Sequence, residues 1–127
     1  MKHNDVGRFG EDVAAKFLKS NGYKIIERNK HMSHNEIDIV ATNKEYIAFV
    51  EVKTRTVGSD LYSIYGTPAE AVDKKKQRRL ITAAKHYLSL NKNIFLQPRM
   101  DVIEIYIDKA SVKVAKINHF EDAFYDS

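Results

Sequence analysis

Three residues within 36–55 have types and spacing suited to binding a metal ion: Asp38, Glu51 and Lys53. Paired carboxylates bind hard divalent cations, and Mg²⁺ takes one or two of them while keeping several of its waters. The scattered histidines of the chain fit such an ion less well. A lysine beside the pair adds a second positive charge. The expected chemistry is therefore that of a Mg²⁺ or Mn²⁺ site, provided that the fold brings the three side chains together.

A β-hairpin brings them together. Residues 36–43 and 46–54 are rich in Ile, Val, Tyr, Phe and Thr, and the polar stretch 43–45 between them predicts a turn. With a two-residue loop, Asp38 lies directly opposite Glu51, and opposed residues have Cβ atoms about 4.5 to 5.5 Å apart. Side chains alternate along a strand, so Lys53 shares the face of Glu51.

Both faces of this hairpin carry apolar residues. Val40 and Phe49 lie beside the carboxylates, and the other face is uniformly apolar: Ile37, Ile39, Ala41, Ala48, Val50 and Val52. Two like charges in such a place repel each other and lose hydration, so the arrangement costs stability unless a positive group lies between them. The alternative is an amphipathic hairpin whose charged residues are simply solvated.

A helix is predicted over residues 5–21, with Asn4 or Asp5 as its cap and Gly22 just past its end. Gly7 and Gly10 are costly in a helix, by roughly 1 kcal/mol each relative to Ala, and suggest close packing there. Glu11 borders the buried stripe and can reach a site at the sheet. The alternative for Glu11 is an ordinary first-turn glutamate favoured by the helix dipole.

Between helix and hairpin we predict a strand over residues 23–28 and a polar loop over 29–35. His31 and His34 fall in this loop and are expected to be solvated, because no third metal ligand follows at a recognisable interval. After the hairpin, residues 56–66 read as an irregular loop. Tyr62 and Tyr65 make that loop a candidate association surface.

A second helix is predicted from the capping sequence Thr67-Pro68-Ala69-Glu70 to about residue 90, with or without a break. Lys76 falls within its apolar stripe. If the helix is continuous, Lys76 points toward the sheet and can meet the carboxylates or a bound phosphate. If the helix breaks near Asp73, Lys76 simply extends its charged end into solvent.

Four more basic residues lie on the outer side of this helix and form two i, i+4 pairs: Lys74 with Arg78, and Lys75 with Arg79. Like charges at this spacing repel and favour a counter-charge, for which nucleic acid phosphate and plain solvation are the two candidates. Strands over 99–107 and 111–117 follow, and the tail 119–127 is expected to form a short helical turn or to fray. The order α-β-β-β-α-β-β predicts an α/β fold with a mixed central sheet flanked by helices.

Composition narrows the function classes. A chain of 127 residues is expected to be one domain, 1–127. Its net charge of +4 agrees with a polyanionic partner such as nucleic acid without requiring one. The absence of Cys excludes disulfides and thiolate metal sites. No signal sequence or membrane span is evident, so no membrane partner and a cytoplasmic location are expected.

The chain resembles the PD-(D/E)xK nucleases, and as a whole it is similar to the uncharacterised bacterial YraN family. The resemblance is carried by the motifs Glu36-Ile37-Asp38 and Phe49-Val50-Glu51-Val52-Lys53-Thr54-Arg55 at this interval. Further matches are Gly10-Glu11, Ala14, Leu18, Asn29, Gly66, Ala71-Val72, Lys76, Arg79-Leu80, Arg99 and Asp101-Val102. Asn35 departs from the family, which has Gly there, but Asn tolerates a left-handed backbone.

The YraN family is similar to archaeal Holliday junction resolvases, which implies a restriction-endonuclease-like fold and a homodimer. The resemblance further implies that Asp38, Glu51 and the Val52 carbonyl bind the divalent cation, that Glu11 completes the acidic shell, and that Lys53 positions or activates the attacking water. Arg55, Lys74, Lys75, Lys76, Arg78 and Arg79 are the expected contacts to nucleic acid.

Three functions compete at this point. The first is a metal-dependent endonuclease that hydrolyses DNA phosphodiester bonds, with branched or structured DNA as a candidate substrate. The second is a nucleic-acid-binding module on a nuclease fold that does not cut. The third is a protein-interaction or structural role in which the acidic pair is only part of a salt-bridged hairpin.

Overall fold

The computed structural model of the protein describes residues 3–58 and 73–125, and in them a five-stranded sheet is flanked by two helices. The chain order α-β-β-β-α-β-β is the predicted one. The helices are α1 (His3–Ser20) and α3 (Lys74–Leu90). The strands are β1 (Lys24–Met32), β2 (Asn35–Thr42), β3 (Tyr46–Val57), β4 (Gln97–Asp108) and β5 (Lys113–Phe124).

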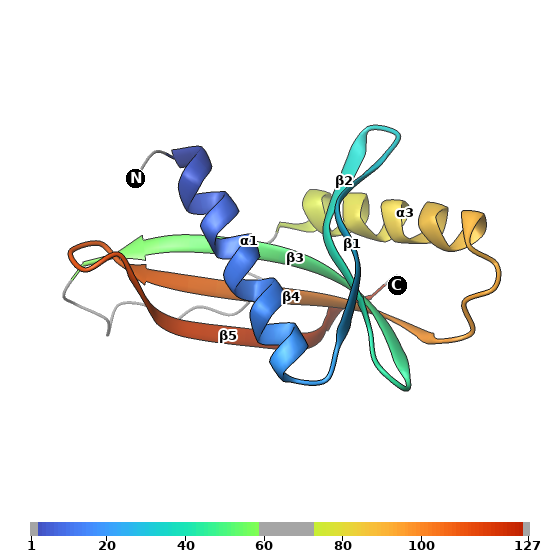
Figure 1. Cartoon of the computed structure of the whole chain (residues 1–127). Helices are drawn as coiled ribbons and strands as arrows, with labels where there is room; N and C mark the ends of the chain where they lie inside the picture. Colours follow the sequence, from blue (N-terminus) through green and yellow to red (C-terminus); the bar gives the residue numbers. More distant parts are fainter. Residues whose placement is uncertain (1–2, 59–72, 126–127) are drawn as a thin grey trace.

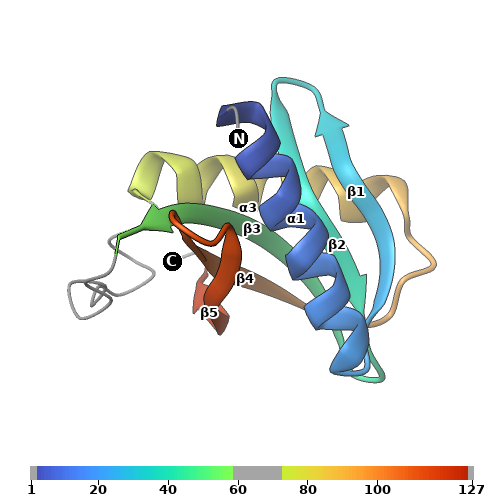
Figure 2. The same cartoon turned by 60° about the vertical axis from the view of Figure 1, so that its left-hand side comes forward.

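The sheet is mixed, and its strands lie side by side in chain order, from β1 to β5. The β3–β4 pair is parallel and the other three pairs are antiparallel. Parallel neighbours need a long crossover connection, and α3 belongs to that connection. Figures 1 and 2 show α1 on one face of the sheet and α3 on the other. Each hydrophobic face of the sheet is therefore covered by one helix.

On its inner side α1 packs against alternate residues of the sheet, and Gly10 sets how close it comes. A Cβ on Gly10 would lie 1.8 Å from Thr54 Oγ1, whereas one on Gly7 would meet nothing within 4 Å. The helix ends at Ser20, and Gly22 in the turn that follows has a φ of +89°, which suits glycine. The buried residues on this face are Ala14, Ala15, Leu18, Tyr23, Ile39, Ala41, Ala48, Val50, Ile103, Ile105 and Ile107.

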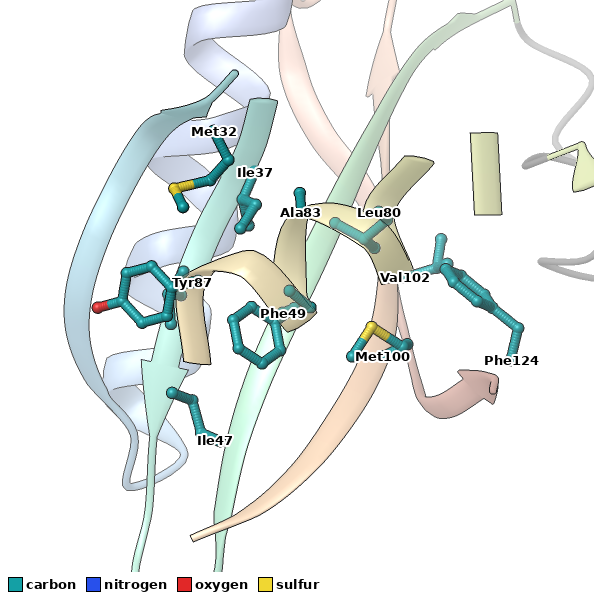
Figure 3. Close-up of a cluster of buried hydrophobic side chains, with 12 residues drawn as sticks. Met32, Ile37, Ile47, Phe49, Leu80, Ala83, Tyr87, Met100, Val102 and Phe124 are labelled. Atoms are coloured by element: carbon teal, nitrogen blue, oxygen red, sulfur yellow. The ribbon is translucent and has the colours of Figure 1, made fainter. Parts of the chain in front are cut away.

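The other face is covered by α3, through Leu80, Ala83, Ala84 and Tyr87 (Figure 3). Phe49 is fully buried there and meets Tyr87 edge to face at 5.8 Å between ring centroids. Truncating such a ring to alanine typically costs about 3 to 5 kcal/mol. The carboxylate-bearing face of the hairpin is thus part of the core, as its apolar pair predicts.

Five details of the sequence prediction are wrong. Close packing was expected at Gly7, but an added Cβ there would meet nothing within 4 Å. The loop predicted over 29–35 is mostly strand, because β1 runs to Met32 and only Ser33 and His34 form the turn. Ser33, with a φ of +60°, takes the left-handed position assigned to Asn35. Ile37 packs on the α3 side, since β2 parts from β3 beyond Ile39. The tail is neither helical nor frayed up to Phe124, because β5 pairs with β4 along it.

The region before α3 divides into a described and an undescribed part. The predicted cap at Thr67 to Glu70, the tyrosines 62 and 65 and most of the 56–66 loop lie outside the described residues. Within the described part, the helix begins after Asp73, which is its N-cap with a φ of −69° and a ψ of 167°. The helix thus starts at the position of the break in one of the two alternatives. Neither described helix is long and apolar enough to cross a membrane.

Candidate active site

The site lies where β2 and β3 diverge. Their ladder pairs Thr42 with Ile47 at the turn and extends to Ile39 opposite Val50. The next pair outward is Asp38 and Glu51, so the predicted register is confirmed. Asn43 closes the turn, because its Oδ1 accepts the N–H groups of Glu45 and Tyr46 at 2.9 and 2.7 Å. The two carboxylates thus come from a locally specified hairpin.

Asp38 takes over a hydrogen bond of the interrupted ladder. The Val52 N–H donates to Asp38 Oδ2 at 2.8 Å. Burial and the nearby Glu51 carboxylate nevertheless raise the pKa of Asp38 to about 8, and the Val52 hydrogen bond only partly opposes them. This is the effect predicted for two carboxylates facing each other in a largely covered site.

Lys76 reaches the carboxylates from α3. Its Nζ lies 2.9 Å from Glu51 Oε1, and the two side chains are 45% and 10% exposed. The Asp73 side chain caps the helix by accepting the Lys76 N–H at 2.8 Å, which places Lys76 in the first turn above the sheet. The helix starts after Asp73, the position at which one alternative placed a break. Lys76 nevertheless meets the acidic pair, which was expected only for a continuous helix.

The two lysines of the site affect each other. Burial and the hydrogen bond with Lys76 lower the pKa of Lys53. Burial alone would lower the pKa of Lys76 as well, but its hydrogen bonds with Lys53 and Glu51 raise it. A lysine with a lowered pKa is better able to accept a proton at neutral pH.

Glu11 reaches the site from α1 and is held there by the side-chain amide of Asn29, a residue to which the sequence analysis gave no role. In the orientation that satisfies it, the Asn29 side chain donates to Glu11 Oε1 at 2.7 Å and to Glu36 Oε1 at 3.0 Å. Burial raises the pKa of Glu11, with Arg28 opposing. The sequence signal that could have pointed to Asn29 was its match to the family pattern. Glu11 thus reaches the site as its helix phase predicts, and Asn29 orients it.

The acidic pair separates two hollows. The larger, of about 860 Å³, is lined by Glu11, Asp38, Glu51 and Lys53 and extends to the β4–β5 turn at Lys109 and Val112. The smaller, of about 250 Å³, lies toward α3 and the β1–β2 turn and is lined by His34, Asn35, Glu36, Arg79 and Leu80 as well as by the pair. Lys76 lines both hollows. The carboxylates are therefore reached from two sides.

The donor set suits Mg²⁺ or Mn²⁺ better than a metal that needs a complete protein cage. Two carboxylates, Asp38 and Glu51, are close enough to affect each other's charge, and Val52 lines the same hollow. In the described ranges no three His, Cys, Asp or Glu side chains form a preformed metal cluster. Glu11 therefore acts on the pair at longer range. A cation here would keep several waters, as Mg²⁺ does.

The predicted nucleic acid contacts surround these hollows unequally. Lys74, Lys75, Arg78 and Arg79 are exposed near the start of α3. No acidic residue lies in the first turn of this helix, although its dipole would favour one. Arg55 is half-exposed, and its Nε lies 3.8 Å from Oε2 of the buried Glu104. Of these four basic residues, Arg79 lines the smaller hollow beside the acidic pair.

The sequence places this chain in a known group. A model of the uncharacterised protein family UPF0102 matches residues 10–105. The chain belongs to the UPF0102 family. Glu11, Asp38, Glu51, Lys53 and Lys76 all fall within the matched residues, which confirms the YraN-type membership predicted from the motifs.

UPF0102 proteins from distant bacteria align over nearly the whole chain. The protein of Caldanaerobacter subterraneus subsp. tengcongensis is 41% identical over 119 residues, covering 94% of this chain and 93% of that relative. One from Clostridium perfringens is 44% identical over 124 residues, with 97% of each chain covered. One from Flavobacterium psychrophilum is 41% identical over 125 residues, covering 98% and 97%.

A second charged cluster of this UPF0102 protein lies in the sheet interior and was missed. Asp101 is fully buried, and its carboxylate accepts from Arg99 Nε and Nη2, each at 2.8 Å, and lies 2.7 Å from His119 Nε2. Arg99 also donates to the Tyr23 hydroxyl. The available signal was a pair of opposite charges two residues apart, Arg99 and Asp101, on one strand. Arg99 and Asp101, both in the family pattern, therefore hold strands together here.

Proposed function

We propose that this UPF0102 protein is a Mg²⁺- or Mn²⁺-dependent endonuclease that hydrolyses DNA phosphodiester bonds, with branched or structured DNA as its substrate. The observation that carries the proposal is the meeting of Asp38, Glu51, Lys53 and Lys76 at the divergence of β2 and β3, between two hollows. A structural ion pair needs one lysine and one carboxylate. This site holds two of each, with perturbed pKa values for Asp38 and both lysines.

The residues present fit the implied metal, and each has a separate role in binding it or in the reaction. Asp38, Glu51 and the Val52 carbonyl would hold the cation. When bound, it lowers the pKa of a water and neutralises charge on the phosphate. The Val52 N–H fixes the orientation of Asp38. Lys53, with its lowered pKa, accepts or orients a proton of the attacking water. Glu11 adds negative charge beside the site, and Asn29 holds it in place.

Access from two sides supports cutting within a strand. A scissile phosphate at the acidic pair has room for neighbouring nucleotides in both hollows, which share Asp38, Glu51 and Lys76. Arg79 borders one hollow and Lys109 the other, so positive charge is available on both sides. An enzyme that only trims strand ends needs just one such approach.

A cleavage assay over duplex, single-stranded, flapped and four-way DNA, with Mg²⁺, Mn²⁺ or EDTA, tests the proposal. We expect metal-dependent cuts, abolished by Asp38→Asn, by Glu51→Gln and by Lys53→Ala, each with DNA affinity and circular dichroism close to those of the unsubstituted protein. Glu45→Gln, in the exposed hairpin loop, is the matched control for charge. Unchanged cleavage in all three site variants would refute the assignment.

The second candidate, a DNA-binding module that does not cut, is favoured by one observation. Lys76 already neutralises Glu51 without a metal ion, at 2.9 Å. If this second candidate is correct, the protein binds DNA with equal affinity in EDTA and in Mg²⁺ and cuts no substrate. The resemblance to resolvases also leads us to propose a homodimer, which light scattering at several concentrations tests directly.

A further inference from the structure

We propose that Lys76 is the built-in counter-ion of the acidic pair, that a divalent cation displaces it from Glu51, and that its released ammonium group then pairs with a phosphate of the substrate. This inference rests on the proposed function and deepens it. It makes Lys76 a substrate-binding residue whose contact changes when the metal binds.

The first step is the overlap of two positive groups on one carboxylate. Lys76 Nζ lies 2.9 Å from Glu51 Oε1, within hydrogen-bonding distance. Asp38 Oδ2 is already occupied by the Val52 N–H at 2.8 Å. A cation held by both carboxylates needs an oxygen from each, and an ammonium group at Glu51 competes for that side chain. The two positive groups also repel at such a distance.

The second step is that Lys76 has somewhere to go. Its side chain is 45% exposed, and it lines the larger and the smaller hollow alike. The four-carbon stem of lysine turns about several bonds, so the ammonium can leave Glu51 without any movement of α3. The helix itself is anchored by the Asp73 cap and by buried Leu80, one turn further on. Displacement therefore changes a rotamer and leaves the fold in place.

The third step concerns the destination. In either hollow the freed ammonium faces the space next to the scissile bond, where a phosphate brings negative charge. Exposed Lys74, Lys75 and Arg78 near the start of the same helix keep other anions near, and Lys76 is the residue paired with Glu51. The metal thus prepares the site twice, by binding the pair and by freeing a lysine for the substrate.

The test compares Lys76→Met with Lys75→Met. Both lose one positive charge from adjacent positions, but Lys75 is exposed. Affinity for Mn²⁺ alone is measured by following the free ion by electron paramagnetic resonance, without DNA. We expect Lys76→Met to bind Mn²⁺ about three to five times more tightly than the unsubstituted protein, the upper part of the range for a half-exposed ion pair. Lys75→Met should stay within about twofold, and Lys76→Arg, which keeps the pair, should stay near the unsubstituted value.

Cleavage of DNA at saturating Mn²⁺ then tests the second part of the proposal, the contact between Lys76 and a substrate phosphate. Lys76→Met should cut at least about tenfold more slowly although its metal site is equally occupied, since it lacks the released ammonium. A merely structural lysine would weaken metal binding and cleavage together. Mn²⁺ affinity that is unchanged or weaker in Lys76→Met overturns displacement, and unchanged cleavage overturns the phosphate contact. If the unsubstituted protein binds Mn²⁺ and cuts no DNA, the endonuclease proposal fails, while tighter binding by Lys76→Met still supports displacement.

Discussion

Asp38 has two neighbours that act on its proton in opposite directions. Burial and Glu51 favour the protonated carboxyl, while the Val52 N–H favours the carboxylate. The first two prevail, and the pKa of about 8 in the fold compares with about 4 for a free aspartate. The folded protein therefore holds this proton more tightly than the unfolded chain between these two pH values.

The sign of the resulting pH dependence follows. A carboxyl with a raised pKa stabilises the fold below its unfolded pKa, and this contribution is lost as pH rises from about 4 to about 8. In EDTA, Asp38→Asn should therefore have a higher Tm than the unsubstituted protein at pH 8 and a similar Tm at pH 4.5. Mg²⁺ binds the ionised pair, so it should raise the Tm of the unsubstituted protein more at pH 8 than at pH 5, and that of Asp38→Asn little.

Thermal unfolding monitored by circular dichroism measures these differences, with Glu45→Gln as the control for loss of one exposed carboxylate. An Asp38→Asn protein that melts lower at pH 8 and responds normally to Mg²⁺ would show the carboxylate to be structural.

At the scale of elements, α1 and β3 approach most closely at Gly10 and Thr54. An added Cβ at position 10 would lie 1.8 Å from Thr54 Oγ1 and 2.9 Å from Thr54 Cβ. Gly10→Ala should therefore lower the free energy of unfolding by about 1 to 3 kcal/mol, the usual cost of overpacking. Gly7→Ala is the matched control, because its Cβ meets nothing within 4 Å. It should raise stability by up to about 1 kcal/mol through helix propensity.

Urea unfolding of the two variants measures both effects, and Thr54→Ala should partly rescue Gly10→Ala. Equal effects of the two glycine substitutions would contradict the close approach. Since Glu11 follows Gly10 directly, we also expect Gly10→Ala to slow cleavage.

The Asp101 cluster joins β4 to β5 and to the start of β1. Asp101 accepts from Arg99, from the Asp122 N–H at 3.0 Å and, through Oδ2, contacts His119. Burial alone would raise the pKa of Asp101, but the hydrogen bonds from His119 and Arg99 lower it. Its contribution to stability is therefore present above pH about 4 and is lost as pH falls through the lowered value.

Asp101→Asn should cost about 3 kcal/mol of unfolding free energy at pH 7, because it leaves the buried Arg99 with only the exposed Glu121, at 3.9 Å, as a counter-charge. Asp122→Asn is the control, since its side chain is exposed and only its backbone N–H joins the cluster. Urea unfolding at pH 7 and pH 3 checks this, and the difference between Asp101→Asn and the unsubstituted protein should shrink at pH 3. A cost below about 0.5 kcal/mol, the level of ordinary surface changes, would refute the role.

For the molecule as a whole, the charge on α3 governs how it meets a polyanion. Lys74, Lys75, Arg78 and Arg79 repel one another near the positive end of the helix dipole, and phosphate relieves that repulsion. DNA affinity should therefore fall steeply with salt. Each phosphate contact contributes about 0.9 to the slope of log K against log salt, so the double variant Lys75→Met, Arg79→Met should flatten it by about 1 to 2.

Fluorescence anisotropy between 50 and 300 mM NaCl, in EDTA to prevent cutting, measures the slope. Lys16→Met with Lys19→Met, a double variant of exposed lysines on α1, controls for net charge. A slope that is the same in both double variants would place the binding surface elsewhere.

The sequence predicts well those features that depend on residues close together along the chain. Alternation and the Asn43 turn set the register that places Asp38 opposite Glu51, and helical phase brings Glu11 to the sheet. The meeting of Lys76 with Glu51 depends on how α3 packs after the Asp73 break, which no local pattern contains. The bond between Arg99 and Asp101 is local, but its partners Tyr23, just before β1, and His119, on β5, are distant in the sequence. The strand β5 reaches Phe124 only because it pairs with β4 along its length.

One hydrogen bond of the site has a practical use. At Val52 the ladder partner of an ordinary strand is replaced by the Asp38 carboxylate, so this single backbone amide is protected by an ionisable side chain. Its exchange with deuterium and its nitrogen chemical shift should follow whatever Asp38 binds, be it a proton or a cation. The chain thus contains its own reporter group, readable by nuclear magnetic resonance in a sample without DNA.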